Sequence, residues 1–183
     1  MKYLFFVDVE TTGIDEQHDL LLEIAGCVLD AETLDQVAGM VEWPVAQGDT
    51  IPKVLLDPWV LETHTNNGLF DAVVSKAARP ISEIDEELSK YLGFWVSEDE
   101  PKIRVAGASV HFDLRFIRRC LPKTAALLHH RVFDTSTLKG ALKTWTGLED
   151  AVFVKNEAHR AVADVEEEIC NARILKHLIC GTT

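Results

Sequence analysis

Residues 3–13 read YLFFVDVETTG, and this stretch decides the fold. Its apolar, β-prone start predicts a strand over residues 2–8 that is buried on both faces. Thr11-Thr12-Gly13 predicts a turn after the strand. Asp8 and Glu10 come at the end of the strand, and side chains at positions i and i+2 of a strand point to the same side. The stretch therefore predicts a buried strand that delivers two carboxylates to one point.

Outward from this strand, the pattern of apolar residues predicts two more strands and then helices alternating with short strands. The further strands are expected over 20–29, 37–45, 103–108 and 131–133, and the helices over 58–65, 84–95, 112–121, 136–145 and 161–178. Ser82 and Asp85 resemble a capping signal for the second helix. Early hairpins are antiparallel and later crossovers are parallel, so we predict an α/β fold with a mixed five-stranded sheet flanked by helices.

The composition places the chain among globular proteins. Its 183 residues are 47% apolar and 26% charged, which is enough for one domain with a substantial core, and we expect a single domain over residues 1–183. No apolar run approaches the ~20 residues of a membrane span. Asp8 comes too early for a secretion signal, so we expect a cytoplasmic protein with no membrane contact. The four cysteines lie far apart, which favours reduced thiols packed as small hydrophobic groups.

The net charge of −12 restricts the kind of nucleic acid that the chain could bind. A protein that holds a long nucleic acid usually shows a basic stripe, because neutralising phosphates supplies most of the non-specific affinity. Lysines and arginines cluster here only at Arg115, Arg118 and Arg119. A nucleic acid substrate should therefore be short, or metal ions should supply the positive charge; the alternative is that the acidity only keeps the protein soluble.

Three more residues join the two carboxylates as candidates. Asp113 and Asp164 each lie near the start of a predicted helix, where an acid alone is explained by the helix dipole. His159 precedes Asp164 by five residues, a spacing that puts the two on different faces of a continuous helix. If both serve one site, His159 should lie on the loop before the helix. Four carboxylates that converge need a cation, and an oxygen-only set suits Mg²⁺ or Mn²⁺.

At this point the chain resembles the DEDDh branch of the 3′–5′ exonucleases, which have an RNase H-like fold, and within that branch the oligoribonuclease family. The four carboxylates and the histidine are the signature of the branch, and the stretch around Trp59, His64 and Gly68-Leu69 points to the oligoribonucleases. The stretches that carry the resemblance span nearly the whole chain: DVETTGID, LLLEIA, DPWVLETHTNNGL, GASVHFDLRF, HHRVFDTSTLK and AHRAVAD.

The resemblance implies a two-metal-ion hydrolase, with a role for each matching residue. Asp8, Glu10, Asp113 and Asp164 would hold two divalent ions, Mg²⁺ or Mn²⁺, and His159 would be the general base. Further residues would bind a short single-stranded oligonucleotide. Ile14 and Trp59 would pack against the bases, His64, Ser109, Ser136 and Thr137 would hold the 5′ phosphate, and Arg131 would reach the neighbouring subunit's site in a homodimer. The products would be nucleoside 5′-monophosphates.

The chain departs from the usual oligoribonuclease pattern at three places. Thr11 stands where the family usually has methionine, His130 replaces a tyrosine, and Val110-His111-Phe112 replaces a more polar run. Glu-Thr-Thr-Gly is the form common in DNA exonucleases of the same branch. Ribo- and deoxyribo-dinucleotides therefore both stay open as substrates.

Two other functions stay open beside this one. The first is a general single-strand DNA exonuclease of the proofreading type, which would cleave long strands at least as well as dinucleotides. The second is a non-catalytic RNase H-like binding module, although all five positions of the catalytic set are filled.

Overall fold

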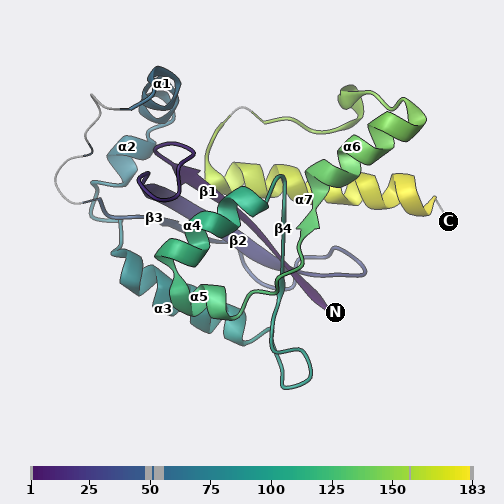
Figure 1. Cartoon of the computed structure of the whole chain (residues 1–183), viewed down its shortest axis with the longest axis horizontal. Coiled ribbons are helices and arrows are strands. Elements are labelled where there is room, and N and C mark those ends of the chain that lie inside the picture. Colours follow the sequence, from purple (N-terminus) through teal and green to yellow (C-terminus); the bar gives the residue numbers. More distant parts are fainter. Residues whose placement is uncertain (1, 48–50, 52–55, 157, 182–183) are drawn as a thin grey trace.

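The computed structural model describes residues 2–47, 51, 56–156 and 158–181. Its centre is a five-stranded sheet with the order β3-β2-β1-β4-β5 (Figure 1). The strands are β1 (Tyr3–Thr11), β2 (Leu21–Asp30), β3 (Val41–Pro44), β4 (Arg104–Gly107) and β5 (Phe133–Asp134). β1–β2 and β2–β3 pair antiparallel, whereas β1–β4 and β4–β5 pair parallel. The predicted mixed sheet is confirmed.

Helices cover both faces of the sheet because β1 alternates its apolar side chains between them. Phe5, Val7 and Val9 pack in one apolar cluster with residues of α3 (Ile81–Gly93), α4 (His111–Cys120) and α5 (Pro122–Ala126). Leu4 and Phe6 pack on the other side against α7 (Ala161–Cys180). α6 (Thr135–Thr146) lies against α7, and the described residues also form a short 3₁₀ turn, η2 (Asp150–Val152).

Two helices stand at one end of the sheet, at the upper left of Figure 1. α1 (Pro58–Asn66) begins where Asp57 accepts a hydrogen bond from the backbone N–H of Trp59 at 2.8 Å, with Pro58 in the first turn. α2 (Leu69–Ala72) follows Gly68, whose φ of +76° suits glycine. The predicted helix 58–65 is therefore confirmed, and Gly68 ends it as expected.

Some expected elements differ in extent. The first strand continues beyond residue 8 to Thr11, since Glu10 still pairs with Glu23 of β2. The third strand was expected over 37–45 but spans only Val41–Pro44, and Gln36 makes an isolated bridge to Leu29 instead. The expected strand over 131–133 lies at Phe133–Asp134.

The capping prediction at Asp85 is wrong. α3 begins after Pro80 with no side-chain cap, and Asp85 instead accepts hydrogen bonds from the backbone N–H groups of Lys123 and Thr124 at 3.0 and 2.8 Å. It thus caps α5, a partner 38 residues away that no local pattern could show. The cysteine prediction holds for Cys27, which is buried, but Cys170 and Cys180 are exposed on α7.

Within the described ranges, none of the helices α1–α7 combines the length and apolarity that crossing a lipid bilayer requires.

Candidate metal centre and active site

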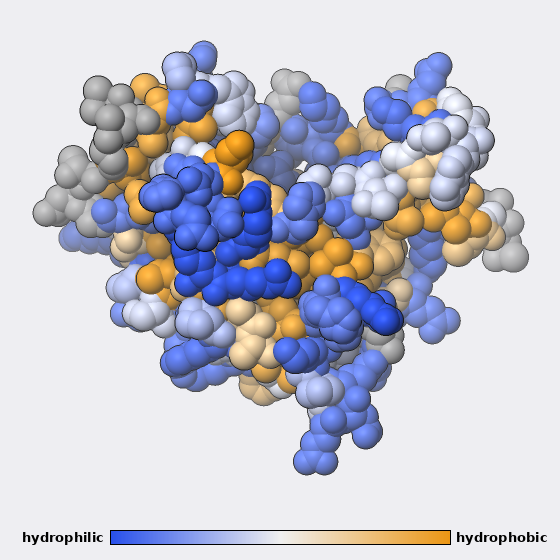
Figure 2. Space-filling model, viewed as in Figure 1, coloured by the Kyte–Doolittle hydropathy of each residue, from blue (hydrophilic) through white to orange (hydrophobic). Residues whose placement is uncertain are grey.

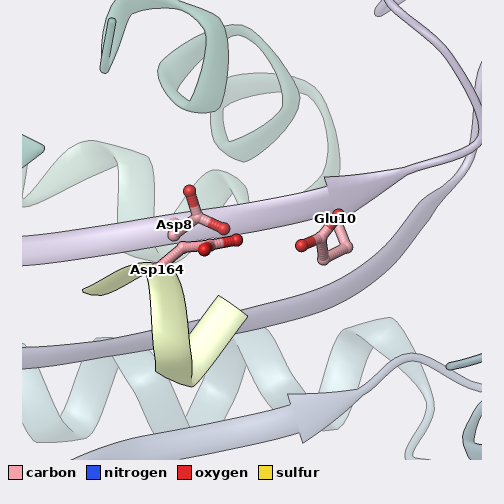
Figure 3. Close-up of side chains that lie close together, drawn as sticks. All are labelled: Asp8, Glu10 and Asp164. Atoms are coloured by element: carbon pink, nitrogen blue, oxygen red, sulfur yellow. The ribbon is translucent and has the colours of Figure 1, made fainter. Parts of the chain in front are cut away.

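Three of the predicted carboxylates converge at the end of the sheet. Asp8 and Glu10 project from β1, and Asp164 projects from the first turn of α7, which packs across β1 (Figure 3). Each of the three offers a ligand atom, and these atoms all lie within 4.8 Å of one another. The arrangement follows from the sequence, because alternate residues of β1 share a side and α7 begins directly above it.

The electrostatics of this cluster favour a bound cation. Burial raises the pKa of Asp8 well above its ordinary value, with the neighbouring charges of Asp113 and Glu10 adding to the effect. Burial also raises the pKa of Glu10 to about 8, and it raises that of Asp164. Like charges held together in a poorly solvated place resist ionisation unless a cation compensates them. An all-oxygen, acidic donor set is what Mg²⁺ or Mn²⁺ prefers, so these residues fit such an ion.

Asp113 lies beside this cluster but is not one of its three members. It is buried in the first turn of α4, and its Oδ1 accepts a hydrogen bond from the backbone N–H of Val9 at 3.0 Å. β4 pairs with β1 only along Leu4–Phe6, so the N–H of Val9 needs another acceptor, and Asp113 supplies it. Burial raises the pKa of Asp113 to about 8. The fourth carboxylate is thus fixed against the strand that carries the first two.

His159 lies on the loop directly before α7, which begins at Ala161, as its spacing from Asp164 predicted. Its φ of +46° falls in the left-handed region, which is rare for a residue with a side chain. The imidazole packs edge-to-face on the Trp59 ring with centroids 5.2 Å apart. The nearby charge of His159 also works against the burial that raises the Asp164 pKa. His159 therefore packs on Trp59 and lies near enough to Asp164 to influence its pKa.

Trp59 opens onto a cleft rather than the core. Its side chain is 57% exposed, so it does not pack in the core. The cleft runs between α1 and the His159 loop and is lined by Trp59, Glu62, Thr63, Asn66, Asn67, Ala158 and His159.

Ile14 is also exposed, at 80%, on the turn between β1 and β2. The turn is tightly built, because a Cβ at Gly13 would meet the Asp19 carboxylate at 2.4 Å, and Thr12 Oγ1 donates to Asp19 at 3.0 Å. Arg119 of α4 donates to the backbone carbonyl of Asp19. A rigid turn thus presents an apolar side chain next to the end of β1.

Ser109 and Ser136 meet where α4 and α6 begin. The backbone N–H of Ser109 donates to Ser136 Oγ at 3.2 Å, and Ser109 has a positive φ of 50°. Asp134, the N-cap of α6, accepts hydrogen bonds from Ser136 Oγ and from the backbone N–H of Thr137. His111 Nδ1 lies 3.9 Å from Asp134 Oδ2. Three of the four predicted phosphate-binding residues, Ser109, Ser136 and Thr137, therefore lie together with Asp134, an acid that the sequence analysis did not single out.

His64 occupies a different environment from the one that its predicted role suggests. Its side chain is 2% exposed, and Nε2 donates to the backbone carbonyl of Thr11 at 3.1 Å and lies 3.8 Å from Glu10 Oε2. The ring packs edge-on against Phe70. Burial lowers its pKa. The buried His64 ring thus supports the end of β1 through its hydrogen bond to Thr11. Its contact with a phosphate stays a prediction.

Arg131 lies on the segment between α5 and β5, where it is exposed. Its backbone N–H donates to His129 Nδ1 at 2.9 Å. Its predicted contact with a second subunit stays a prediction.

Sequence reasoning missed a buried ion pair next to the site. Glu23 of β2 is fully buried, and both of its carboxylate oxygens accept hydrogen bonds from Arg160. The backbone N–H of Ala161 donates to the same carboxylate at 3.0 Å, and Glu42 binds Arg160 at 3.1 Å. An acid inside the apolar run LLLEIA and an arginine directly after His159 were the available signals. The pair fixes the start of the helix that carries Asp164.

Comparison with known proteins agrees with this geometry. A family model described as an exonuclease matches residues 5–170. An oligoribonuclease from Salmonella typhimurium is 35% identical over 168 residues, covering 91% of this chain and 89% of that protein. One from Yersinia enterocolitica is 36% identical with the same coverage.

Solved structures with the same fold are larger proteins. An exonuclease I from Methylocaldum szegediense superposes with a TM-score of 0.72 at 18% identity, over 97% of this chain and 41% of that one. An E. coli exonuclease I in a complex with single-stranded DNA gives a TM-score of 0.70 at 17% identity over 96% of this chain and 40% of that one. This chain thus spans about two fifths of their length, and the likeness concerns the fold. With a family model and curated relatives that each span most of its length, the chain belongs to the exonuclease family, among the members named oligoribonucleases.

Proposed function

We propose that this chain is a metal-dependent 3′–5′ exonuclease that hydrolyses very short single-stranded oligonucleotides, RNA or DNA, to nucleoside 5′-monophosphates. The observation that carries the proposal is the convergence of Asp8, Glu10 and Asp164, from β1 and α7, on one point beside Asp113 and His159. The oligoribonuclease relatives favour short substrates for the same site.

Each group has a distinct task in this reaction. Asp8, Glu10, Asp113 and Asp164 would hold the divalent ions, Mg²⁺ or Mn²⁺. Once bound, such ions supply Lewis-acid stabilisation of the charge that develops on the phosphate and on the leaving 3′ oxygen. His159 would take the proton from the attacking water, a role that suits imidazole at neutral pH.

The exposed aromatic and apolar groups support binding of a few nucleotides irrespective of sequence. The Trp59 face in the cleft would stack on a base, an interaction worth roughly 1–3 kcal/mol, and Ile14 would pack beside it. Ser109, Ser136 and Thr137 would bind the 5′ phosphate, with His64 reaching it only after its ring moves. Binding both ends of a dinucleotide requires no long basic groove, so a net charge of −12 is compatible with it.

A general single-strand DNA exonuclease is the second candidate, since α4 offers the one basic cluster seen in the sequence. Figure 2 shows strongly hydrophilic residues over α4, where Arg115, Arg118 and Arg119 are exposed. Arg115 pairs with Glu16 at 3.1 Å, and Arg119 binds the carbonyl of Asp19. Two of the three arginines therefore already hold the β1–β2 turn, which favours the short substrate.

The test is a comparison of substrate lengths at equal concentration. A dinucleotide, a 5-mer and a 20-mer, each as RNA and as DNA, would be assayed with Mg²⁺ and with Mn²⁺. We expect turnover to be highest for the dinucleotide. A rate that rises with length would refute the short-substrate proposal and favour the second candidate. Unchanged activity in Asp113→Ala would show that the carboxylates are not catalytic.

His159→Ala tests the general base. We expect it to retain metal and substrate binding while turnover falls by on the order of 10²–10⁴. A loss of metal affinity with little further change in turnover would identify His159 as a ligand instead.

The rest of the proposal concerns the location, domain organisation and assembly of the enzyme. We propose a cytoplasmic homodimer in which residues 1–183 form a single exonuclease domain and Arg131 reaches the neighbouring site. Mixing His159→Ala with Arg131→Ala protein tests this arrangement: a dimer that shares sites would regain part of the activity, whereas independent subunits would regain none.

A further inference from the structure

We propose that Asn67 is a positioning residue for His159, and that it couples the end of α1 to the general base. This inference rests on the proposed function, because it assigns Asn67 a part in the proton transfer by His159. Asn67 was not among the residues singled out in the sequence, and it lies on a different element from every predicted metal ligand.

The contacts of Asn67 are directed at the His159 loop. Its Nδ2 donates hydrogen bonds to the backbone carbonyl of His159 and, at 3.3 Å, to that of Ala158. Asn67 and His159 are 92 positions apart in the sequence, so this contact depends on the tertiary fold. One side-chain amide thus holds two consecutive carbonyls of the loop on which the base lies.

These hydrogen bonds matter because the backbone of His159 adopts a left-handed conformation, which is unfavourable for a residue with a side chain. A φ of +46° is disfavoured for residues with a Cβ and persists only where the surroundings impose it. On the far side of His159, Arg160 and the N–H of Ala161 are bound to the buried Glu23. Asn67 supplies the restraint on the near side. Without it, the backbone at His159 would be free to relax to a common conformation and turn the imidazole away.

The two polar atoms of the Asn67 side chain bind different partners. Its Oδ1 accepts a hydrogen bond at 3.0 Å from the backbone N–H of Leu69, the first residue of α2, whereas Nδ2 binds the loop. Asn67→Asp keeps an acceptor for Leu69, replaces the donor by an oxygen and adds a negative charge, for which a charge control on α1 accounts. The substitution therefore separates support of the helix from positioning of the base, because aspartate matches asparagine in size.

We would measure kcat, KM and the half-saturating Mn²⁺ concentration for a dinucleotide in four proteins: wild type, Asn67→Asp, His159→Ala and the double variant. Thr65→Asp, which puts the same charge on an exposed position of α1, is the matched control. We expect Asn67→Asp to lower kcat by about 10- to 100-fold with Mn²⁺ dependence unchanged, since small displacements of a catalytic group cost rates of this order. In the His159→Ala background it should lower kcat no further, because the group that it positions is gone.

The four proteins and the Thr65→Asp control together distinguish failure of this inference from failure of the proposed function. If His159→Ala has wild-type kcat, the proposed base is wrong. If His159→Ala is slow but Asn67→Asp is as fast as Thr65→Asp, Asn67 does not position the base. Equal losses from Asn67→Asp in both backgrounds would likewise refute positioning, since the effect would then reach catalysis by another route. Thermal unfolding of each variant identifies a loss caused by misfolding, and in that case Asn67→Ser repeats the cycle with a smaller donor.

Discussion

Replacing Glu10 by glutamine should make the metal-free protein more stable at alkaline pH, although it removes a predicted metal ligand. Burial, together with the charges of Asp164 and Glu23, raises the pKa of Glu10 from 4.5 to about 8. A carboxyl group with a raised pKa keeps its proton in the folded protein after the unfolded chain has lost it. Folding is therefore progressively penalised as the pH rises from 4.5 to about 8, and the penalty is constant above that range.

The size of the effect follows from the pKa difference. A pKa difference of about 3.5, at 1.36 kcal/mol for each pKa unit, corresponds to roughly 5 kcal/mol in the free energy of unfolding. The Glu10 side chain is only 13% exposed, so solvent screening removes a minor part. The charges of Glu10, Asp8 and Asp164 affect one another's pKa, so the penalty is spread over several groups. We expect Glu10→Gln to gain about 2–5 kcal/mol over wild type at pH 9 and close to nothing at pH 4.5.

Urea unfolding in EDTA across this pH range measures the difference directly. Glu98→Gln removes the same charge from an exposed loop and controls for the change in net charge, so its curve should run parallel to that of wild type. Adding Mg²⁺ or Mn²⁺ at pH 8 should stabilise wild type more than Glu10→Gln, because a cation compensates the carboxylates. A difference between Glu10→Gln and wild type that does not change with pH would refute the reasoning, since Glu10 would then not be desolvated among its neighbours.

Two further predictions concern the cleft and the buried ion pair. Trp59→Ala should raise KM for a dinucleotide roughly 5- to 100-fold, because the base loses its stacking partner. It should lower kcat by a smaller factor, because His159 loses its contact with the Trp59 ring. Steady-state kinetics measure the two effects separately, and an unchanged KM would contradict stacking. Glu23→Gln should lower the free energy of unfolding in urea by about 3–5 kcal/mol, because Arg160 loses its buried charged partner. Glu42 also pairs with Arg160, but its side chain is 41% exposed, so Glu42→Gln should lower it by less than about 1 kcal/mol. Equal losses would contradict the role of burial.

The parts of the site that the sequence could predict are those that depend on local geometry. The i, i+2 spacing of Asp8 and Glu10 follows from the pleat of a strand, and the place of Asp164 follows from an amphipathic helix that starts just before it. The five-residue separation of His159 from Asp164 puts the two on different faces of a continuous helix, so a shared site required the histidine to lie on the loop, where the structure has it. Each of these predictions uses one element at a time.

The parts that could not be predicted depend on which elements meet. Asp85 could cap its own helix or a distant one, and only the packing of α3 on α5 decides between them. The burial of His64 depends on Phe70 and on the carbonyl of Thr11, which local patterns cannot place beside it. The partner of Glu23, Arg160, is 137 residues away, so no local pattern shows that this acid is paired.

The restraints around the site explain how it stays assembled despite its own repulsion. Converging carboxylates with raised pKa values oppose folding when no cation is bound, so other contacts must hold their elements together. The contact between Glu23 and Arg160 fixes the first turn of α7 and with it Asp164, whereas Asn67 fixes the residue before Arg160. Because these restraints act on consecutive residues through different side chains, we expect that the proposed metal site and the proposed general base can be perturbed separately. Glu23→Gln should accordingly weaken Mn²⁺ binding, and Asn67→Asp should leave it unchanged.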